Sequence, residues 1–142
     1  MKTTLPALRE SDIARTCSDF LMMDGWRMLI TDPVSDRGRG KGFGELGMAD
    51  RLYIRYGFSQ PGMFNMAIPN ADICHRSQCE VMWIEWKRID GRGRTTQASA
   101  HQRAWIESER ARGALVLLAG VDFPASINGF LHYYRNSGLA RK

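Results

Sequence analysis

The sequence predicts an α/β fold in which a mixed central sheet is flanked by helices, and three observations carry this prediction. Apolar residues recur at helical spacing over residues 13–21, near the N-terminus. Apolar and polar side chains alternate over residues 81–87, as they do in a strand with two different faces. Residues 114–119 form a continuous apolar run, which is typical of a strand that is covered on both faces.

The first expected element is a helix over residues 5–24. Thr4 is suited to cap this helix, Pro6 suits its first turn and Gly25 can end it. Glu10 lies one turn ahead of the apolar stripe and on the same side of the helix. A carboxylate near a helix start is favoured by the helix dipole. The alternative is that Glu10 has a partner or a task, because an acid on an apolar face loses solvation.

Three strands are expected next, at residues 26–31, 48–56 and 80–88. A basic glycine-rich loop over residues 32–44 separates the first two, and an insertion over residues 57–79 separates the second and third. A Gly/Arg loop at 89–95 leads to a helix over residues 96–112, with Thr95 or Thr96 as its cap and Gly113 at its end. The strand at 114–119 and a helix at 124–135 complete the order helix, three strands, helix, strand, helix.

The length of 142 residues fits one domain over residues 1–142. No apolar run approaches the roughly 20 residues needed to cross a bilayer, and the first ten residues lack the apolar stretch of a secretory signal. We therefore expect a cytoplasmic protein that does not associate with membranes. Three cysteines do not indicate a disulfide framework in that compartment.

The segment from Val81 to Lys87 is the most informative for chemistry. Alternation places Met82, Ile84 and Trp86 on one strand face and Glu85 and Lys87 on the other. Asp50 follows Gly47-Met48-Ala49 at the start of another strand. If the two strands pair, Asp50 and Glu85 can share a hard divalent cation such as Mg²⁺, with the backbone carbonyl of Trp86 as a third ligand.

Such a cation can polarise a phosphate and lower the pKa of a bound water. Lys87 can position that water or stabilise negative charge on the phosphate. An Asp followed later by Glu-x-Lys resembles the signature of the restriction-endonuclease-like superfamily, also called PD-(D/E)XK. That family's core has the order helix, three strands, helix, strand, which matches the order expected for this chain.

Within that superfamily the chain resembles the VRR-NUC domain, the virus-type replication-repair nuclease, in its stand-alone phage type. Four local features carry the resemblance: Glu10 in the first helix, Gly-Met-Ala-Asp ending at Asp50, Ile-Glu-Trp-Lys at 84–87, and Gln102 followed by Trp105. Together with the apolar strand after Gly113, they span the chain from Glu10 to about residue 119. The long stretch between Asp50 and Glu85 departs from the simplest family pattern.

The resemblance implies a role for each matching residue. Asp50, Glu85 and the Trp86 carbonyl look like ligands of Mg²⁺ or Mn²⁺, and Lys87 looks like the catalytic lysine. Glu10 looks like an acid that reaches the metal directly or through water, and Gln102 looks like a glutamine that lines the site. The implied activity is a dimeric DNA endonuclease that is selective for branched DNA, such as a Holliday junction or a flap.

The net charge of +5 is concentrated in two clusters. We expect these basic side chains to hold the DNA backbone without reading its sequence, because lysine and arginine displace counterions from phosphates. The alternative is that the charge serves solubility alone. Apart from Lys87, the cluster residues are Arg37, Arg39, Lys41, Arg88, Arg92 and Arg94.

Other interpretations of the sequence stay open. A zinc site would need Cys74, His75 and Cys79, but zinc sites usually have two paired ligand sets. The glycine-rich residues 38–42 lack the spacing of a nucleotide-binding P-loop. Rival functions are another resolvase or restriction-like nuclease, a DNA-binding or assembly protein without turnover on the same fold, and a nuclease acting on RNA.

Overall fold

The computed structural model describes residues 8–31, 44–56, 79–90 and 92–141. Its elements follow the order that the sequence predicts, with shorter bounds. They are α1 (Glu10–Met23), β1 (Arg27–Ile30), β2 (Arg51–Tyr56), β3 (Cys79–Glu85), α3 (Ala100–Ala111), β4 (Leu115–Leu118) and α4 (Ile127–Asn136). No helix in these ranges is long and apolar enough to cross a membrane.

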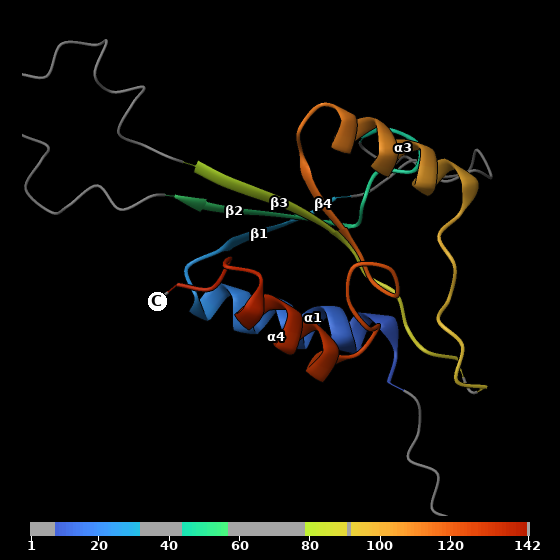
Figure 1. Ribbon diagram of the computed structural model, residues 1–142, viewed down its shortest axis with the longest axis horizontal. Helices are drawn as coiled ribbons and strands as arrows, with labels where there is room; N and C mark the ends of the chain where they lie inside the picture. Colours follow the sequence, from blue (N-terminus) through green and yellow to red (C-terminus); the bar gives the residue numbers. More distant parts are fainter. Residues whose placement is uncertain (1–7, 32–43, 57–78, 91, 142) are drawn as a thin grey trace, which may run out of the picture.

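The four strands form one mixed sheet in the order β1-β2-β3-β4. β1 pairs with β2 and β2 with β3 in antiparallel fashion, whereas β3 and β4 are parallel. Helices α1 and α4 lie together on one face of the sheet and α3 lies on the other (Figure 1). The predicted α/β class with a mixed sheet between helices is therefore confirmed.

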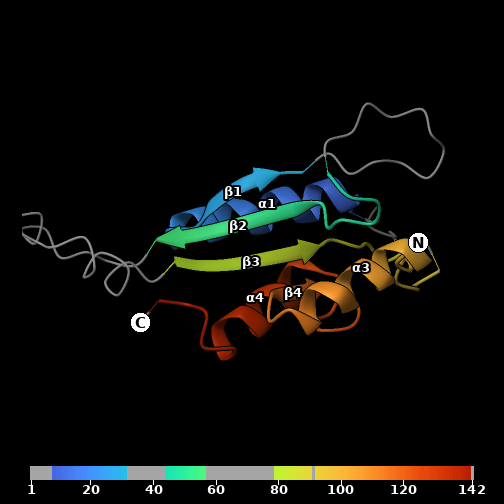
Figure 2. The same ribbon diagram turned by 90° about the horizontal axis from the view of Figure 1, so that it is seen from above.

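The larger hydrophobic core lies between the sheet and the pair α1 and α4. Seen from above, α1 lies along β1 and β2, and α4 lies on the β4 side of the sheet (Figure 2). Cys17 and Leu21 come from α1, Tyr53 from β2, and Phe130 from α4, and all four side chains are fully buried. The predicted helical stripe at residues 13–21 thus faces the core, as expected for an amphipathic helix.

A smaller core lies between the sheet and α3, and it contains Ala49, Trp105, Ile106, Val116 and Leu118. Leu117 of the same strand packs on the opposite side, in the larger core. The apolar run that forms β4 is therefore covered on both faces, as predicted.

Helix α1 starts later than predicted. Leu8 and Arg9 precede the helix, and Arg9 has an extended backbone with no side-chain cap. The first turn carries Glu10 and Asp12, whose charges suit the positive end of the helix dipole. The predicted cap Thr4 and first-turn Pro6 lie outside the described residues. Gly25 follows the helix with a φ of +88°, as the predicted ending requires.

The start of α3 corrects a second prediction. The cap is Ser99, not Thr95 or Thr96, and its hydroxyl accepts a hydrogen bond from the backbone N–H of Gln102. Thr96 is engaged elsewhere, because its N–H donates to the carbonyl of Arg88. This pairing keeps residues 96–98 out of the helix.

Strand bounds differ for a similar reason. The expected strand at 48–56 begins only at Arg51, since Gly47 has a φ of +82° and Met48 donates to the carbonyl of Glu45 in a turn. The expected strand at 80–88 ends at Glu85, because Arg88 pairs with Thr96 instead of continuing the sheet. Likewise α4 begins at Ile127, where Ser126 supplies the cap.

Candidate active site

Asp50 and Glu85 face each other where β2 begins and β3 ends. The register pairs Arg51 with Ile84, so one further step brings Asp50 opposite Glu85. The backbone N–H of Asp50 donates to Oε2 of Glu85 at 3.2 Å. Glu85 is 0% exposed, which is rare for a carboxylate outside a functional or paired site. The structure therefore brings together the two acids that the sequence separates by a long insertion.

Lys87 and Gln102 both contact the other oxygen of Glu85. The ammonium Nζ of Lys87 donates to Oε1 of Glu85 at 2.6 Å, and Nε2 of Gln102 donates to the same oxygen at 2.5 Å. Lys87 also donates to the amide oxygen of Gln102 at 3.3 Å. Glu85, Lys87 and Gln102 thus form one closed hydrogen-bonded triangle, in which each member holds the other two.

Gln102 owes its position to the start of α3. Its amide oxygen accepts a hydrogen bond from the backbone N–H of Ser99 at 2.9 Å, while Ser99 Oγ accepts from the N–H of Gln102 at 3.1 Å. This reciprocal capping box fixes the first turn of the helix. The same amide that completes the cap therefore reaches the buried carboxylate, so the geometry of the cap is transmitted to the site.

Gly47 brings the loop before Asp50 against the same helix turn. A Cβ atom on Gly47 would lie 2.3 Å from the carbonyl oxygen of His101 and 2.8 Å from the backbone nitrogen of Gln102. Only glycine permits that approach, and its φ of +82° is a conformation that other residues rarely adopt. The Gly-Met-Ala-Asp segment thus has a physical reason for its glycine.

Three carboxyl groups interact at this site. Burial raises the pKa of Glu85 to about 7, and the nearby charge of Asp50 contributes to that rise, whereas Lys87 opposes it. Burial also raises the pKa of Asp50. The pKa of Glu10 is raised by burial and by Asp50, against the lowering effect of Lys87. Glu10 is therefore close enough to sense both groups, although it comes from a distant part of the chain.

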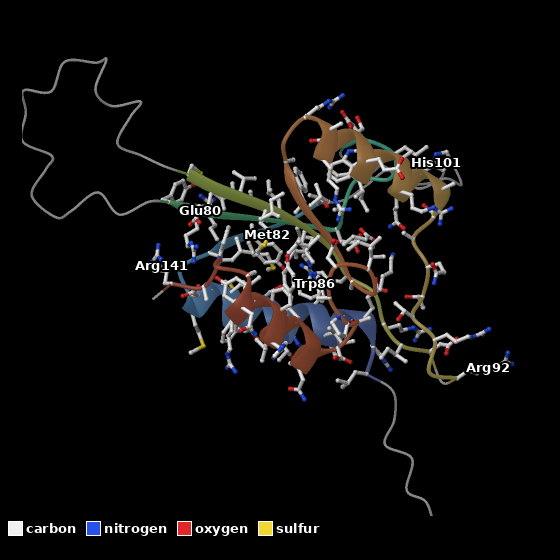
Figure 3. The ribbon with its side chains drawn as sticks, in the orientation of Figure 1. Glu80, Met82, Trp86, Arg92, His101 and Arg141 are labelled. Atoms are coloured by element: carbon white, nitrogen blue, oxygen red, sulfur yellow. The ribbon has the colours of Figure 1, made fainter. Side chains whose placement is uncertain are left out.

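A cleft of about 250 Å³ opens beside these acids, between the start of α1 and the ends of the strands. It is lined by Glu10, Ser11, Ala14, Ile30, Thr31, Asp50, Arg51 and Trp86. The predicted residues Glu10, Asp50 and Trp86 therefore share one cleft. Trp86 itself lies between the sheet and the helix pair α1 and α4 (Figure 3), with its ring in the larger core.

The described side chains supply only some of the ligands that a hard cation needs. Within the described ranges, no three His, Cys, Asp or Glu side chains gather closely enough to hold a metal ion. Asp50 lines the cleft with Trp86, whereas Glu85 does not line it and offers Oε2, which accepts one hydrogen bond, from the N–H of Asp50. Mg²⁺ prefers such oxygen donors and keeps several water ligands. The donor chemistry thus suits a cation bound by two carboxylates, a backbone carbonyl and water.

The loop after Lys87 carries the basic residues that the sequence predicts. Asp90 accepts hydrogen bonds from the backbone N–H groups of Arg92 and Arg94, which lower its pKa. It also forms an ion pair with Arg94 at 3.2 Å. Arg88 and Arg92 form no ion pair with another described residue, and Arg92 extends away from the body of the protein (Figure 3). Arg37, Arg39 and Lys41 lie outside the described residues.

The structure describes one of the candidate zinc ligands and also Trp83. Cys79 is exposed, and the other two candidate zinc ligands, Cys74 and His75, lie outside the described residues. Trp83 is partly buried and packs edge-on against Trp105 at 5.2 Å between ring centroids, at the smaller core.

Arg51 is the cleft residue that sequence reasoning missed. Alternation places it on the core face of β2 with Tyr53, where a functional arginine is not expected.

Comparison of the chain with models of protein families, with curated proteins and with solved structures gave no match.

Proposed function

We propose that the protein is a metal-dependent DNA endonuclease that hydrolyses phosphodiester bonds, with a restriction-endonuclease-like core of the VRR-NUC type. The observation that carries the proposal is the triangle of Glu85, Lys87 and Gln102, with Asp50 opposite Glu85. A buried carboxylate with a raised pKa, beside a cleft and a lysine, is a frequent signature of a functional site. The order of helices and strands supports the same proposal.

In this proposal Asp50, Glu85 and the Trp86 carbonyl hold Mg²⁺ or Mn²⁺, which activates a water and polarises the phosphate when bound. Lys87 stabilises negative charge on the phosphate or positions the water. Gln102 keeps Glu85 and Lys87 in register with each other. Glu10 orients water at the edge of the cleft, and the products carry a 5′-phosphate and a 3′-hydroxyl.

Further parts of the proposal concern substrate and assembly. Arg88 and Arg92 hold the DNA backbone, together with Arg94 and the basic residues Arg37, Arg39 and Lys41. A homodimer places two sites against two strands, as cleavage of branched DNA requires. We propose that the protein acts in the cytoplasm, in a bacterial host if the chain is phage-encoded.

A cleavage assay tests the proposal. A four-way junction, a flap, a duplex and single-stranded DNA are incubated with Mg²⁺, Mn²⁺ or EDTA. Wild-type protein is expected to cut at least one substrate only with metal, and Asp50→Asn and Glu85→Gln are expected to lose cutting. The matched control is Glu107→Gln, which changes an exposed glutamate of α3 and should cut normally. Cutting that persists in both site variants would overturn the assignment.

A DNA-binding protein without turnover is the second candidate. The observation that favours it is the lack, among the described residues, of three gathered metal-binding side chains. It predicts DNA binding that is unchanged by metal and by Glu85→Gln, with no cutting of any substrate. Metal-dependent cutting excludes it.

A further inference from the structure

Arg51 and Arg55 lie on the same face of β2 but have different partners. β2 presents Arg51, Tyr53 and Arg55 toward α1 and α4. Arg55 is 4% exposed, and its charge is balanced by ion pairs to Asp24 at 3.0 Å and to Glu80 at 2.6 Å. Arg51 forms no ion pair with any described carboxylate, and its contact is a weak one to the sulfur of Met28 at 3.6 Å.

Arg51 instead lines the cleft next to Asp50. Glu10 and Asp50 line the same cleft, and the charge of Arg51 lowers the pKa of Asp50. Among the described residues the half-buried guanidinium donates only to the sulfur of Met28, so its other N–H groups can form a strong charge-assisted interaction with an anion that enters the cleft. The planar fork of arginine matches the geometry of phosphate oxygens. The Arg51 guanidinium therefore marks where a phosphate would bind. Arg51 is next in sequence to Asp50, which we propose as a metal ligand.

The rest of the cleft suits the remainder of a nucleotide. Ile30 pairs with Arg51 across β1 and β2, and it is 69% exposed although it is apolar. Ala14 adds a second apolar wall, and Ser11 and Thr31 add hydroxyl groups. A volume of about 250 Å³ lies just below the range of about 300–1,000 Å³ for small-molecule pockets. The cleft is thus of a size for one small ligand, such as a single nucleotide.

We propose that this cleft binds one unpaired nucleotide next to the bond that is cut, with its phosphate on the Arg51 guanidinium and its sugar and base against Ile30. The proposal rests on the nuclease function above and names its substrate class, which is DNA with an unpaired strand at the cleavage point. The cleft lies between the start of α1 and the ends of β1 and β2, and the proposal predicts that a paired strand leaves its partner to enter it.

The first test measures DNA binding in EDTA, where no cutting occurs. Fluorescence anisotropy compares a labelled oligothymidylate with a duplex of equal length. Arg51→Gln is expected to weaken binding of the single strand about tenfold, which is the usual size of one lost charged hydrogen-bonding contact, and to change duplex binding much less. The matched control is Arg27→Gln, an exposed arginine of the neighbouring strand outside the cleft, which should leave both affinities unchanged.

A second variant pair avoids any change in the sheet. Ser11→Glu adds a negative charge at the cleft in the second position of α1, where an acid suits the helix dipole and folding is safe. Thr16→Glu adds the same charge to an exposed position of α1 outside the cleft. Ser11→Glu is expected to weaken single-strand binding several-fold more than Thr16→Glu, because only the former repels the phosphate on Arg51.

The outcomes separate this inference from the proposed function. If wild type cuts DNA but Arg51→Gln and Ser11→Glu bind the single strand as their controls do, the nucleotide site is wrong and the nuclease stands. Equal weakening for single strand and duplex would assign Arg51 to general backbone binding and overturn the substrate class. If wild type neither binds nor cuts any DNA, the nuclease proposal fails first, and this inference fails with it.

Discussion

At the scale of single residues, Glu85 stands out because its surroundings disfavour the charged form of its carboxyl group. The side chain is fully buried and faces a second carboxylate, and among the described residues Lys87 and two hydrogen-bond donors compensate for its charge. Burial of charge without full compensation costs stability, so such a group is expected where a ligand or a reaction uses it. Stability and activity are therefore expected to oppose each other at this position.

The raised pKa of Glu85 predicts how stability depends on pH. Between the ordinary value of 4.5 and about 7, the folded protein keeps a proton that the unfolded chain has released. The metal-free protein should therefore lose stability as pH rises from 5 to 8, by about 1–3 kcal/mol. Urea unfolding in EDTA at several pH values measures this. Asp50→Asn removes a charge that raises the pKa of Glu85, so the stability of this variant should change less with pH. An identical slope in both proteins would show that Asp50 does not raise the pKa of Glu85.

At the scale of elements, the start of α3 links folding to the site. The sequence predicts a helix in this region with Thr95 or Thr96 as its cap, whereas the folded chain uses Ser99, which has similar chemistry. Only the pairing of Thr96 with Arg88 decides among them, and that contact is a property of the folded chain. The existence of the helix was thus predictable from local pattern, whereas its first residue was not.

Ser99→Ala should separate the two roles of this cap. Loss of the hydroxyl costs about 1 kcal/mol of stability and loosens the turn that holds Gln102. We expect slower metal-dependent cleavage with unchanged DNA affinity. Ser126→Ala is the matched control, since it removes the equivalent cap of α4, which is not part of the site. Equal cleavage rates for the two variants, at similar losses of stability, would show that the cap does not position Gln102.

Gly47 offers a second test at this scale. Gly47→Ala combines an unfavourable backbone conformation with a clash against the carbonyl of His101, so it should displace Asp50 and lower both stability and cleavage. Gly138 has the same φ of +82°, but a Cβ there would meet nothing within 4 Å. Gly138→Ala should therefore cost only the backbone term of about 1–2 kcal/mol and leave cleavage intact. Thermal unfolding and cleavage rates of the two variants decide, and matched losses of stability would refute the clash.

At the scale of the whole molecule, the sheet separates the candidate site from a structural network. The acids meet where β2 begins, and Arg55 lies toward the other end of the same strand. The meeting of Asp50 and Glu85 was predictable from the expected pairing of their two strands, and the place of Glu10 was implied by the family resemblance. Arg51 and Arg55 were not predictable, because alternation assigns them to the core face, and only the folded chain shows which of them meets carboxylates and which meets a cleft.

The Arg55 network supplies the last prediction. Arg55 joins β2 to Asp24 after α1 and to the carbonyl of Leu139 near the C-terminus at 2.6 Å, and its guanidinium stacks over Trp26 at 4.4 Å. Arg55→Met should lower the free energy of unfolding by about 3 kcal/mol, because it removes two ion pairs and leaves Asp24 only the hydrogen bonds from the Tyr134 hydroxyl and the Arg141 N–H.

Cleavage by Arg55→Met at a temperature well below its Tm should stay close to the wild-type rate, since the network contacts neither Asp50 nor Glu85. Urea unfolding and an initial-rate assay on the same preparation check both halves. A folded variant that has lost cleavage would mean that the two ends of the sheet are coupled, because the arginine would then control the acids through β2 itself.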